Sequence, residues 1–362
     1  MNVDDKSSRP RNPPTTKTDW IIMSRIFYLT AALVTGLIAT RVITTSAAEP
    51  PEPKKNKSPS GLFNFKTSTR GGAQFWADEL FLRDWHIQRN VVTGHCRLLD
   101  GKNVRHAWGS FAQCHAKLDE IKKKQKLKPY TGKAVICLHG LGRGPAAMKS
   151  MTTFLQKDGN YVVYNVAYPT TQAGVGEHAK KLDGIIRHLE GVEEINFVAH
   201  SLGNLVVRHY LADQTDEKRG LKPDQRIKRI VMLGPPNHGT VLAKKYGKNW
   251  AWEAVAGAVG QQLGRDWDKL EKKLATPHCQ FGIVAGGKGT EGFNPLLPGN
   301  DDGVVRVEEA RLAGARDFAV APVVHMFLKD DATVQEYTLR FLQKGHFISE
   351  EKRQPIVAKG KR

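Results

Sequence analysis

Short apolar runs alternate with amphipathic segments over the second half of the chain. Between the runs, apolar residues recur at the spacing of a helix face. The runs predict strands at Lys133–Leu138, Tyr161–Val166, Ile195–Val198, Ile227–Leu233 and Phe281–Ala285, and one near Phe318. The amphipathic segments predict helices at Pro145–Lys157, Val175–Glu190, Asn204–Leu211 and Ala332–Leu342. This alternation predicts an α/β fold, with an open, mostly parallel sheet and helices on both faces.

One stretch, residues 247–274, breaks the alternation. It carries several tryptophans and small apolar residues without a strand pattern. Two interpretations are open, because an aromatic stripe at helical spacing serves either packing or recognition. In the first, the stretch is a helical cap or lid, and Trp250, Trp252 and the nearby His238 line a substrate cleft. In the second, it is an extra surface helix packed on the core.

The N-terminal part, residues 1–48, has the features of an export signal. The 15 residues from Ile26 to Thr40 are uncharged and mainly apolar, and arginines stand on either side. This length is typical of a signal-peptide core and short for a spanning helix. We therefore expect a signal peptide cleaved after Ser46-Ala47-Ala48, or an uncleaved anchor that gives membrane association. Met23 is an alternative start. Both interpretations place the protein outside the cytoplasm, periplasmic, secreted or membrane-anchored.

Residues 49–61, rich in Pro, Lys and Ser, are predicted to be a flexible linker. An accessory region, residues 62–130, follows, and its many aromatic residues indicate that it folds. We expect a helix near Phe75–Asp84, a strand pair flanking Asp100-Gly101, and a helix over Gly109–Lys124. Both edge strands of the main sheet and a separate module are compatible with this pattern.

The four cysteines contain no CxxC pair and give no metal-site pattern. Cys96 and Cys114 both fall in the accessory region, and in an exported protein they could form a disulfide. Cys137 lies in a predicted core strand and Cys279 precedes another, so both are expected to be buried thiols.

The formal net charge of +19 lies mostly outside the alternating segment. Residues 131–339 hold 26 basic and 23 acidic residues, so this part carries about +3. A basic polar tail, residues 348–362, and the lysine-rich run Lys122–Lys128 contribute to the excess. No aromatic-interleaved basic surface, zinc spacing or nucleic-acid motif accompanies these charges. We therefore expect no nucleic-acid partner.

Ala199-His200-Ser201-Leu202-Gly203 has the pattern of a serine on a sharp strand-to-helix turn. An apolar strand precedes it and a helical pattern follows, which is the context that such a nucleophile elbow requires. The turn is crowded, so the residues two before and two after the serine must be small. Ala199 and Gly203 meet that need. A serine before a helix is otherwise only an N-cap.

A serine nucleophile needs a histidine as base and an acid that orients the imidazole. In chain order, Asp302 and then His325 follow Ser201, each just past a predicted strand. Asp301 is the alternative acid, and Asp302 is favoured because it directly precedes the Gly-Val-Val turn. Four other histidines are candidates for this role: His209, His238, His278 and His346. His325 is favoured because it follows both the acid and a predicted strand.

The strand Val135–Leu138 runs into a His139-Gly140 turn, after which the Leu141 backbone N–H is free to bind an oxyanion. The Leu202 N–H, next to the serine, is the expected second donor. His139 and His200 are expected to brace the two turns by hydrogen bonding. Leu141, Ser201, Asp302 and His325 all follow strands, and in a parallel sheet such positions gather at one edge.

These motifs together resemble the α/β-hydrolase superfamily, and within it the bacterial lipases and lipase-like esterases. Three carry the likeness: the His139-Gly140 turn, the His-Ser-x-Gly elbow and Asp302-Gly303-Val304-Val305. Gly234–Thr240 also resembles a turn of those lipases. The likeness covers Lys133–Phe347 and departs from the common pattern at Ala199. It implies an α/β-hydrolase catalytic domain over residues 131–347.

The predicted function is a serine hydrolase that cleaves carboxylic esters, small-molecule or lipid, through an acyl-enzyme, without cofactor or metal. Ser201 is the expected nucleophile, His325 the base and Asp302 the acid. Two alternatives stay open. An acyltransferase would pass the same acyl group to an alcohol, and a non-catalytic binding protein would use the fold alone.

Overall fold

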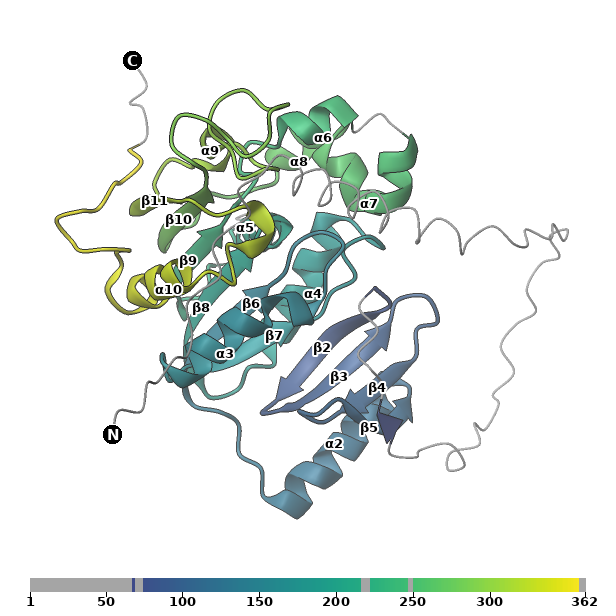
Figure 1. The fold of residues 1–362 in the computed structure, drawn as a ribbon. Coiled ribbons are helices and arrows are strands. Elements are labelled where there is room, and N and C mark those ends of the chain that lie inside the picture. Colours follow the sequence, from purple (N-terminus) through teal and green to yellow (C-terminus); the bar gives the residue numbers. More distant parts are fainter. Residues whose placement is uncertain (1–66, 69–73, 216–221, 247–249, 358–362) are drawn as a thin grey trace, which may run out of the picture. The chain divides into compact units, whose positions relative to one another are not determined.

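The computed structural model describes residues 67–68, 74–215, 222–246 and 250–357 (Figure 1). All of them belong to one compact unit, residues 61–362. The predicted export segment and linker lie outside the described residues, as do residues 358–362 of the predicted tail.

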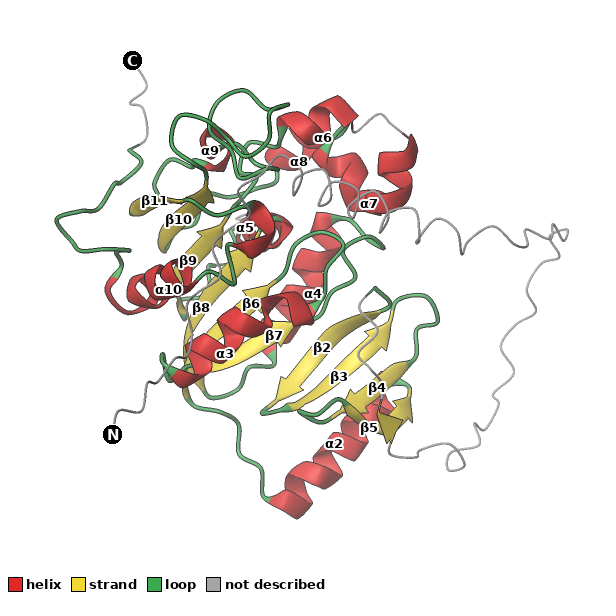
Figure 2. Ribbon diagram, in the orientation of Figure 1, coloured by secondary structure: helices red, strands yellow, loops and turns green. Residues whose placement is uncertain are grey.

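A six-stranded sheet forms the centre of the fold, and every neighbouring pair of its strands is parallel (Figure 2). The strand order is β11-β10-β9-β8-β6-β7. The strands are β6 (Gly132–Leu138), β7 (Val162–Val166), β8 (Val192–His200), β9 (Ile227–Leu233), β10 (Gln280–Gly286) and β11 (Asp317–Ala321). Each strand predicted from the apolar runs is present, so the expected parallel sheet is confirmed.

The helices follow strands of this sheet along the chain, and each of the four predicted amphipathic segments overlaps one of them. A 3₁₀ turn, Pro145–Met148, precedes the first of them, and another, His325–Phe327, follows β11. The helices are α3 (Lys149–Lys157), α4 (Val175–Arg187), α5 (Leu202–Gln214), α6 (Val241–Tyr246), α7 (Trp250–Leu263), α8 (Trp267–Glu271), α9 (Val307–Ala310) and α10 (Ala332–Lys344).

Two hydrophobic layers cover the two faces of this sheet, as alternation along β6 shows. Ile136 and Leu138 belong to the larger layer, where α4 and α5 contribute residues such as Leu182. Val135 and Cys137 belong to the other layer, which includes side chains of α3 and α10. Because successive strand residues point to opposite faces, an apolar strand such as β6 requires helices on both sides.

The accessory region forms a separate five-stranded antiparallel sheet of order β1-β5-β4-β3-β2. Helix α2 (Phe111–Gln125) belongs to it, and Ser110 caps this helix through a bond from the Gln113 backbone N–H. A small core of residues such as Ile87, Leu98 and Leu118 joins sheet and helix. The strands are β1 (Thr67–Ser68), β2 (Trp76–Leu82), β3 (Trp85–Asn90), β4 (Cys96–Leu99) and β5 (Val104–Gly109).

The helix predicted near Phe75–Asp84 is wrong, because β2 occupies this segment. A β-bulge between Asp78 and Leu80 shifts the register of β2 against β3. The shift changes which face the later residues occupy, so the apolar positions mimic helical spacing. The predicted strand pair around Asp100 and the helix after it are β4, β5 and α2. Cys96 and Cys114 are buried free thiols, so the disulfide considered for them is not present.

The stretch 247–274 contains α7 and α8, and α7 is kinked at Gly257, where φ is 58° and ψ is −152°. Trp267 is buried against the body of the fold. The side chains of Trp250 and Trp252 lie outside the described residues, so the lid interpretation stays a prediction. Within the described ranges, every helix is too short or too polar to span a bilayer.

Candidate active site

Ser201 lies at a sharp turn between β8 and α5, with φ at 54° and ψ at −121°. A non-glycine residue at such a positive φ is strained and needs support from its surroundings. The support comes from β9, since the Ser201 backbone N–H donates to the Leu233 carbonyl at 2.9 Å. The Asn204 side-chain amide also donates to the Ser201 carbonyl, at 3.0 Å. These bonds hold the serine in the geometry of a nucleophile elbow.

Gly203 lets the turn after β6 approach the elbow closely. A Cβ atom at this position would lie 2.9 Å from both Cβ and the carbonyl oxygen of Leu138, and 3.1 Å from the carbonyl oxygen of His139. No side chain fits there. Glycine at this position therefore brings the His139-Gly140 turn against the start of α5, as the elbow pattern requires.

His325 lies between Ser201 and Asp302. Its Nε2 is 2.9 Å from the Ser201 Oγ, and its Nδ1 is 2.7 Å from Asp302 Oδ2. The His325 backbone N–H also donates to the Asp302 carbonyl at 2.8 Å. The imidazole and the carboxylate are buried, with relative exposures of 6% and 1%. Three residues spread over more than a hundred positions thus form one hydrogen-bonded series.

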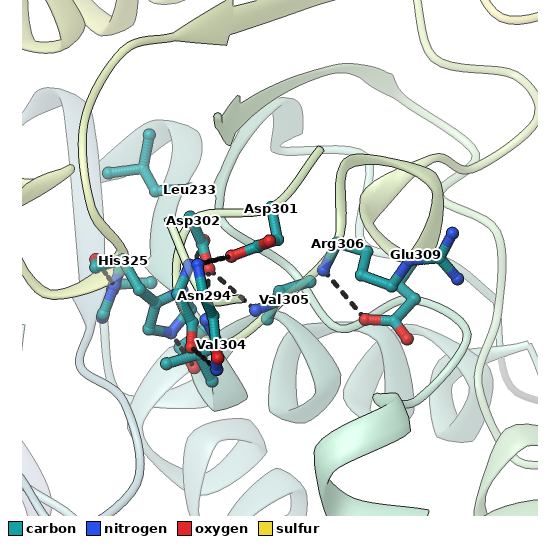
Figure 3. Close-up of polar contacts among 12 residues, drawn as sticks. Leu233, Asn294, Asp301, Asp302, Val304, Val305, Arg306, Glu309 and His325 are labelled. Carbon is teal, nitrogen blue, oxygen red and sulfur yellow. Dashed lines mark hydrogen bonds and ion pairs between the residues drawn. The ribbon is translucent and has the colours of Figure 1, made fainter. Parts of the chain in front are cut away.

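The two adjacent aspartates have different surroundings (Figure 3). Asp302 Oδ1 accepts the Val304 and Val305 backbone N–H groups at 3.0 and 2.7 Å, which leaves Oδ2 for His325. Asp301 Oδ1 instead accepts from the backbone of Asn294 and Gly303. Burial raises the pKa of Asp301, and its Oδ2 has no hydrogen-bond partner. The structure therefore brings Asp302, rather than Asp301, to the histidine.

His200 braces the segment that carries His325. Its Nε2 lies 2.9 Å from the His325 carbonyl oxygen, and the two rings are 4.8 Å apart. Burial lowers the pKa of His200 well below its ordinary value. A neutral imidazole with the proton on Nε2 donates to this carbonyl, and the ring stays neutral beside His325.

Gly234 lies at the site beside His325, although the sequence alone identifies it only as part of the Gly234–Thr240 turn. It has φ at 53°, and a Cβ there would lie 3.0 Å from His325 Nδ1 and 2.9 Å from Leu328 Cδ1. The His325 ring therefore rests on the Gly234 backbone. A Gly-Pro turn after a strand is a signal for a close approach, but it does not say which ring approaches.

The two expected oxyanion donors follow the turn and the elbow. Leu202 is the first residue of α5, so its N–H has no helical carbonyl to bind. Leu141 follows the His139-Gly140 turn and packs on the larger layer. His139 is fully buried, stacks on Tyr168 with ring centroids 4.3 Å apart, and has its Nδ1 3.0 Å from the Gly140 carbonyl oxygen.

The other histidines considered for the site have different partners. His209 Nδ1 lies 3.1 Å from Asp213 Oδ2 on α5, and His238 Nδ1 lies 3.3 Å from Glu271 Oε1 on the surface. Within the described part of the chain, the imidazole that hydrogen-bonds Ser201 Oγ is that of His325, and not that of His278 or His346. In the same part, no group of three or more His, Cys, Asp or Glu side chains is arranged to hold a metal ion.

A parallel sheet with a strained serine after β8 and a histidine after β11 defines the α/β-hydrolase fold, which confirms the resemblance found in the motifs. Residues 130–241 match the protein family described as "Putative serine esterase (DUF676)". This match spans β6 to the turn after β9 and includes the elbow. No curated protein sequence matches the chain.

Solved structures of low sequence identity are also similar. The Bacillus licheniformis lipase BlEst2, in its mature form, is 18% identical, with a TM-score of 0.43 over 60% of this chain and 93% of the lipase. The lin2722 gene product from Listeria innocua is 17% identical, with a TM-score of 0.42 over 62% and 97%. An esterase from Thermogutta terrifontis is 14% identical, with a TM-score of 0.38 over 60% and 92%.

Gly234→Ala is expected to push the His325 ring away from Ser201, because the new methyl group would overlap the ring. Labelling of Ser201 by a fluorophosphonate, followed by mass spectrometry, should slow by roughly 3- to 10-fold, since the ring must yield by a few tenths of an ångström and a displacement of about 1 Å costs about 100-fold. Gly184→Ala, where a Cβ meets nothing within 4 Å, is the matched control. Equal labelling of both variants would show that the ring does not depend on Gly234.

Stability should fall as the pH drops, because burial lowers the pKa of His139 to about 4. Between this value and 6.5 the unfolded chain binds more protons than the folded one, so acid favours unfolding. This histidine should remove about 2 kcal/mol of unfolding free energy between pH 7 and pH 5.

Urea denaturation at the two pH values measures this loss. His139→Phe keeps a ring against Tyr168 and should show a smaller difference between pH 7 and pH 5, by that amount. His95→Phe, at an exposed histidine, is the control. If His139→Phe lost as much unfolding free energy between pH 7 and pH 5 as the unaltered chain, His139 would not be the cause of the loss.

Proposed function

We propose that the chain is a serine hydrolase that cleaves carboxylic esters through an acyl-enzyme. The hydrogen-bonded series Ser201–His325–Asp302 carries this proposal. The family matched over residues 130–241 supports the same reaction class. A strained serine, an imidazole and a buried carboxylate in one hydrogen-bonded series have the geometry that a nucleophile, its base and its orienting acid require.

In the proposed mechanism, Ser201 Oγ attacks the ester carbonyl carbon while His325 Nε2 accepts the hydroxyl proton. Asp302 accepts a hydrogen bond from His325 Nδ1–H, and this bond fixes the tautomer in which Nε2 is free to act as a base. The same carboxylate stabilises the imidazolium that forms. His325 then gives the proton to the leaving alcohol, and an acyl group remains on Ser201. A water molecule gives a proton to the same imidazole and attacks the acyl carbonyl carbon. When this second tetrahedral intermediate collapses, the bond from the acyl carbon to Ser201 Oγ breaks, His325 returns the proton to Oγ, and the carboxylic acid leaves.

The carbonyl oxygen becomes an anion in each tetrahedral intermediate, and the backbone N–H groups of Leu141 and Leu202 are the proposed donors to it. One such donor is worth about 100- to 1000-fold in rate. The N-terminal end of α5 adds a favourable partial positive charge at the same place.

Two exposed apolar residues close in sequence to the proposed catalytic residues favour an ester whose acyl chain is apolar. Val304 follows Asp302 by two residues and is 38% exposed, and Phe327 follows His325 by two and is 50% exposed. Exposed apolar groups beside a site provide surface for an apolar ligand. Export through residues 1–48, and any membrane association there, stays a prediction because that segment lies outside the described residues.

Ser201→Ala is expected to abolish hydrolysis of p-nitrophenyl esters from acetyl to palmitoyl, since alanine lacks the attacking oxygen. The loss should be at least about 1000-fold, measured as release of nitrophenol. The chain-length preference of the unaltered protein separates a short-acyl esterase from a lipase. Hydrolysis that survives in Ser201→Ala would refute the site, and an ester product formed from added alcohol would indicate an acyltransferase.

Asp302→Asn should lower kcat about 1000- to 10,000-fold, because an amide in this place favours the wrong tautomer of His325. Asp301→Asn is the matched control at the neighbouring residue. Its remaining amide oxygen can still accept the Asn294 and Gly303 amides, so kcat should change by less than about tenfold. If the two variants had equal effects, the distinction between the aspartates would be wrong.

A further inference from the structure

We propose that the accessory region positions part of the active site. Gln74 and β2 hold in place the turn that supplies the Leu141 oxyanion donor. This inference rests on the proposed function. It assigns a role to the accessory region, which the catalytic series itself does not use. Gln74 would be a positioning residue, since it touches the turn rather than the substrate.

Strand β2 is hydrogen-bonded to the loop after β7. Asp78 and Ala167 bond in both directions: the Asp78 N–H donates to the Ala167 carbonyl at 2.9 Å, and the Ala167 N–H donates to Asp78 Oδ2 at 2.6 Å. Asp78 is 2% exposed, and its other oxygen accepts from Gln88 Nε2 at 2.8 Å. A buried carboxylate with both oxygens bonded fixes the two chains to one another.

This loop, residues 167–171, in turn contacts the oxyanion turn, residues 139–143. The Tyr168 hydroxyl donates to the His139 carbonyl, and the two rings are stacked. Further along, the Gly142 N–H donates to Thr170 Oγ1 at 2.8 Å. The loop thus holds the turn on both sides of Leu141.

Gln74 joins these parts directly. Its Nε2 donates to the Arg143 carbonyl at 2.6 Å, and its Oε1 accepts from the Thr171 hydroxyl at 3.1 Å. One amide side chain therefore uses its donor on the oxyanion turn and its acceptor on the loop that holds the turn. Gln74 is 69 residues from Arg143 and 97 from Thr171 in the sequence.

The turn needs such support because it lies between β6 and the 3₁₀ turn that begins at Pro145, outside regular structure. An oxyanion donor must lie about 2.7–3.1 Å from the position that the developing negative oxygen will occupy, so a loose turn weakens its contribution. The hydrogen bond from Gln74 restricts the backbone two residues after Leu141. Loss of this bond is expected to weaken transition-state binding while leaving substrate binding and the fold in place.

Gln74→Ala tests the proposal, with Gln113→Ala as the matched control. Gln113 is an exposed glutamine in the same accessory region, and its side-chain oxygen accepts the Ser110 backbone N–H in the cap of α2. In Gln74→Ala, kcat for a p-nitrophenyl ester should fall about 10- to 100-fold, with KM within about twofold. The Ki of an aryl trifluoromethyl ketone, whose adduct with serine carries an oxyanion, should rise by the same factor. The melting temperature should match that of Gln113→Ala.

Hydrogen exchange separates failure of this inference from failure of the proposed function. Amides of residues 139–144 should exchange at least about tenfold faster in Gln74→Ala than in Gln113→Ala, whether or not the protein hydrolyses esters. Equal exchange in the two variants would overturn the inference. Faster exchange with unchanged kcat and Ki in an active enzyme would overturn it as well, since the turn would then move without affecting the oxyanion.

Discussion

The site depends on the backbone of Ser201, a non-glycine residue held at a φ of 54°. This conformation is unfavourable by itself, so it exists only where the surrounding structure enforces it. The bond from the Ser201 N–H to the Leu233 carbonyl of β9 ties the turn to a central strand. Gly203 then allows the β6 turn to approach within contact distance. In this backbone conformation the Ser201 hydroxyl lies at the edge of the sheet, within hydrogen-bond distance of His325 Nε2.

Around this turn, the loops after several strands converge because the sheet is parallel. The loop before α9 supplies Asp302, the segment after β11 supplies His325, and the turn after β9 supplies the Gly234 backbone beneath its ring. Among the described side chains around the site, three buried polar atoms have no hydrogen-bond partner: Asp301 Oδ2, Asn204 Oδ1 and His139 Nε2. The accessory sheet enters the same network from outside, through Asp78 and Gln74. The proposed catalytic unit therefore extends beyond the strands that define the fold.

Much of this arrangement can be predicted from the sequence, because strand and helix periods are local properties. The succession of the main strands along the chain, the elbow pattern and the three proposed catalytic residues come from patterns a few residues long. The Gly-Val-Val turn favours Asp302 over Asp301 in the sequence, and the structure gives the physical reason: the Val304 and Val305 amides orient the Asp302 carboxylate toward His325. β2 was not predictable because its bulge changes the period. The contacts of Gln74 join segments far apart in sequence, and no local pattern indicates them.

Trapping of the acyl-enzyme tests the central claim most directly. The protein is mixed with a p-nitrophenyl ester, quenched in acid within milliseconds, digested and mapped by mass spectrometry. The account predicts one acyl group, on the peptide that contains Ser201, formed in step with the first burst of nitrophenol. Nitrophenol released at the same rate with no acyl group on that peptide, or with one on another residue, would contradict it.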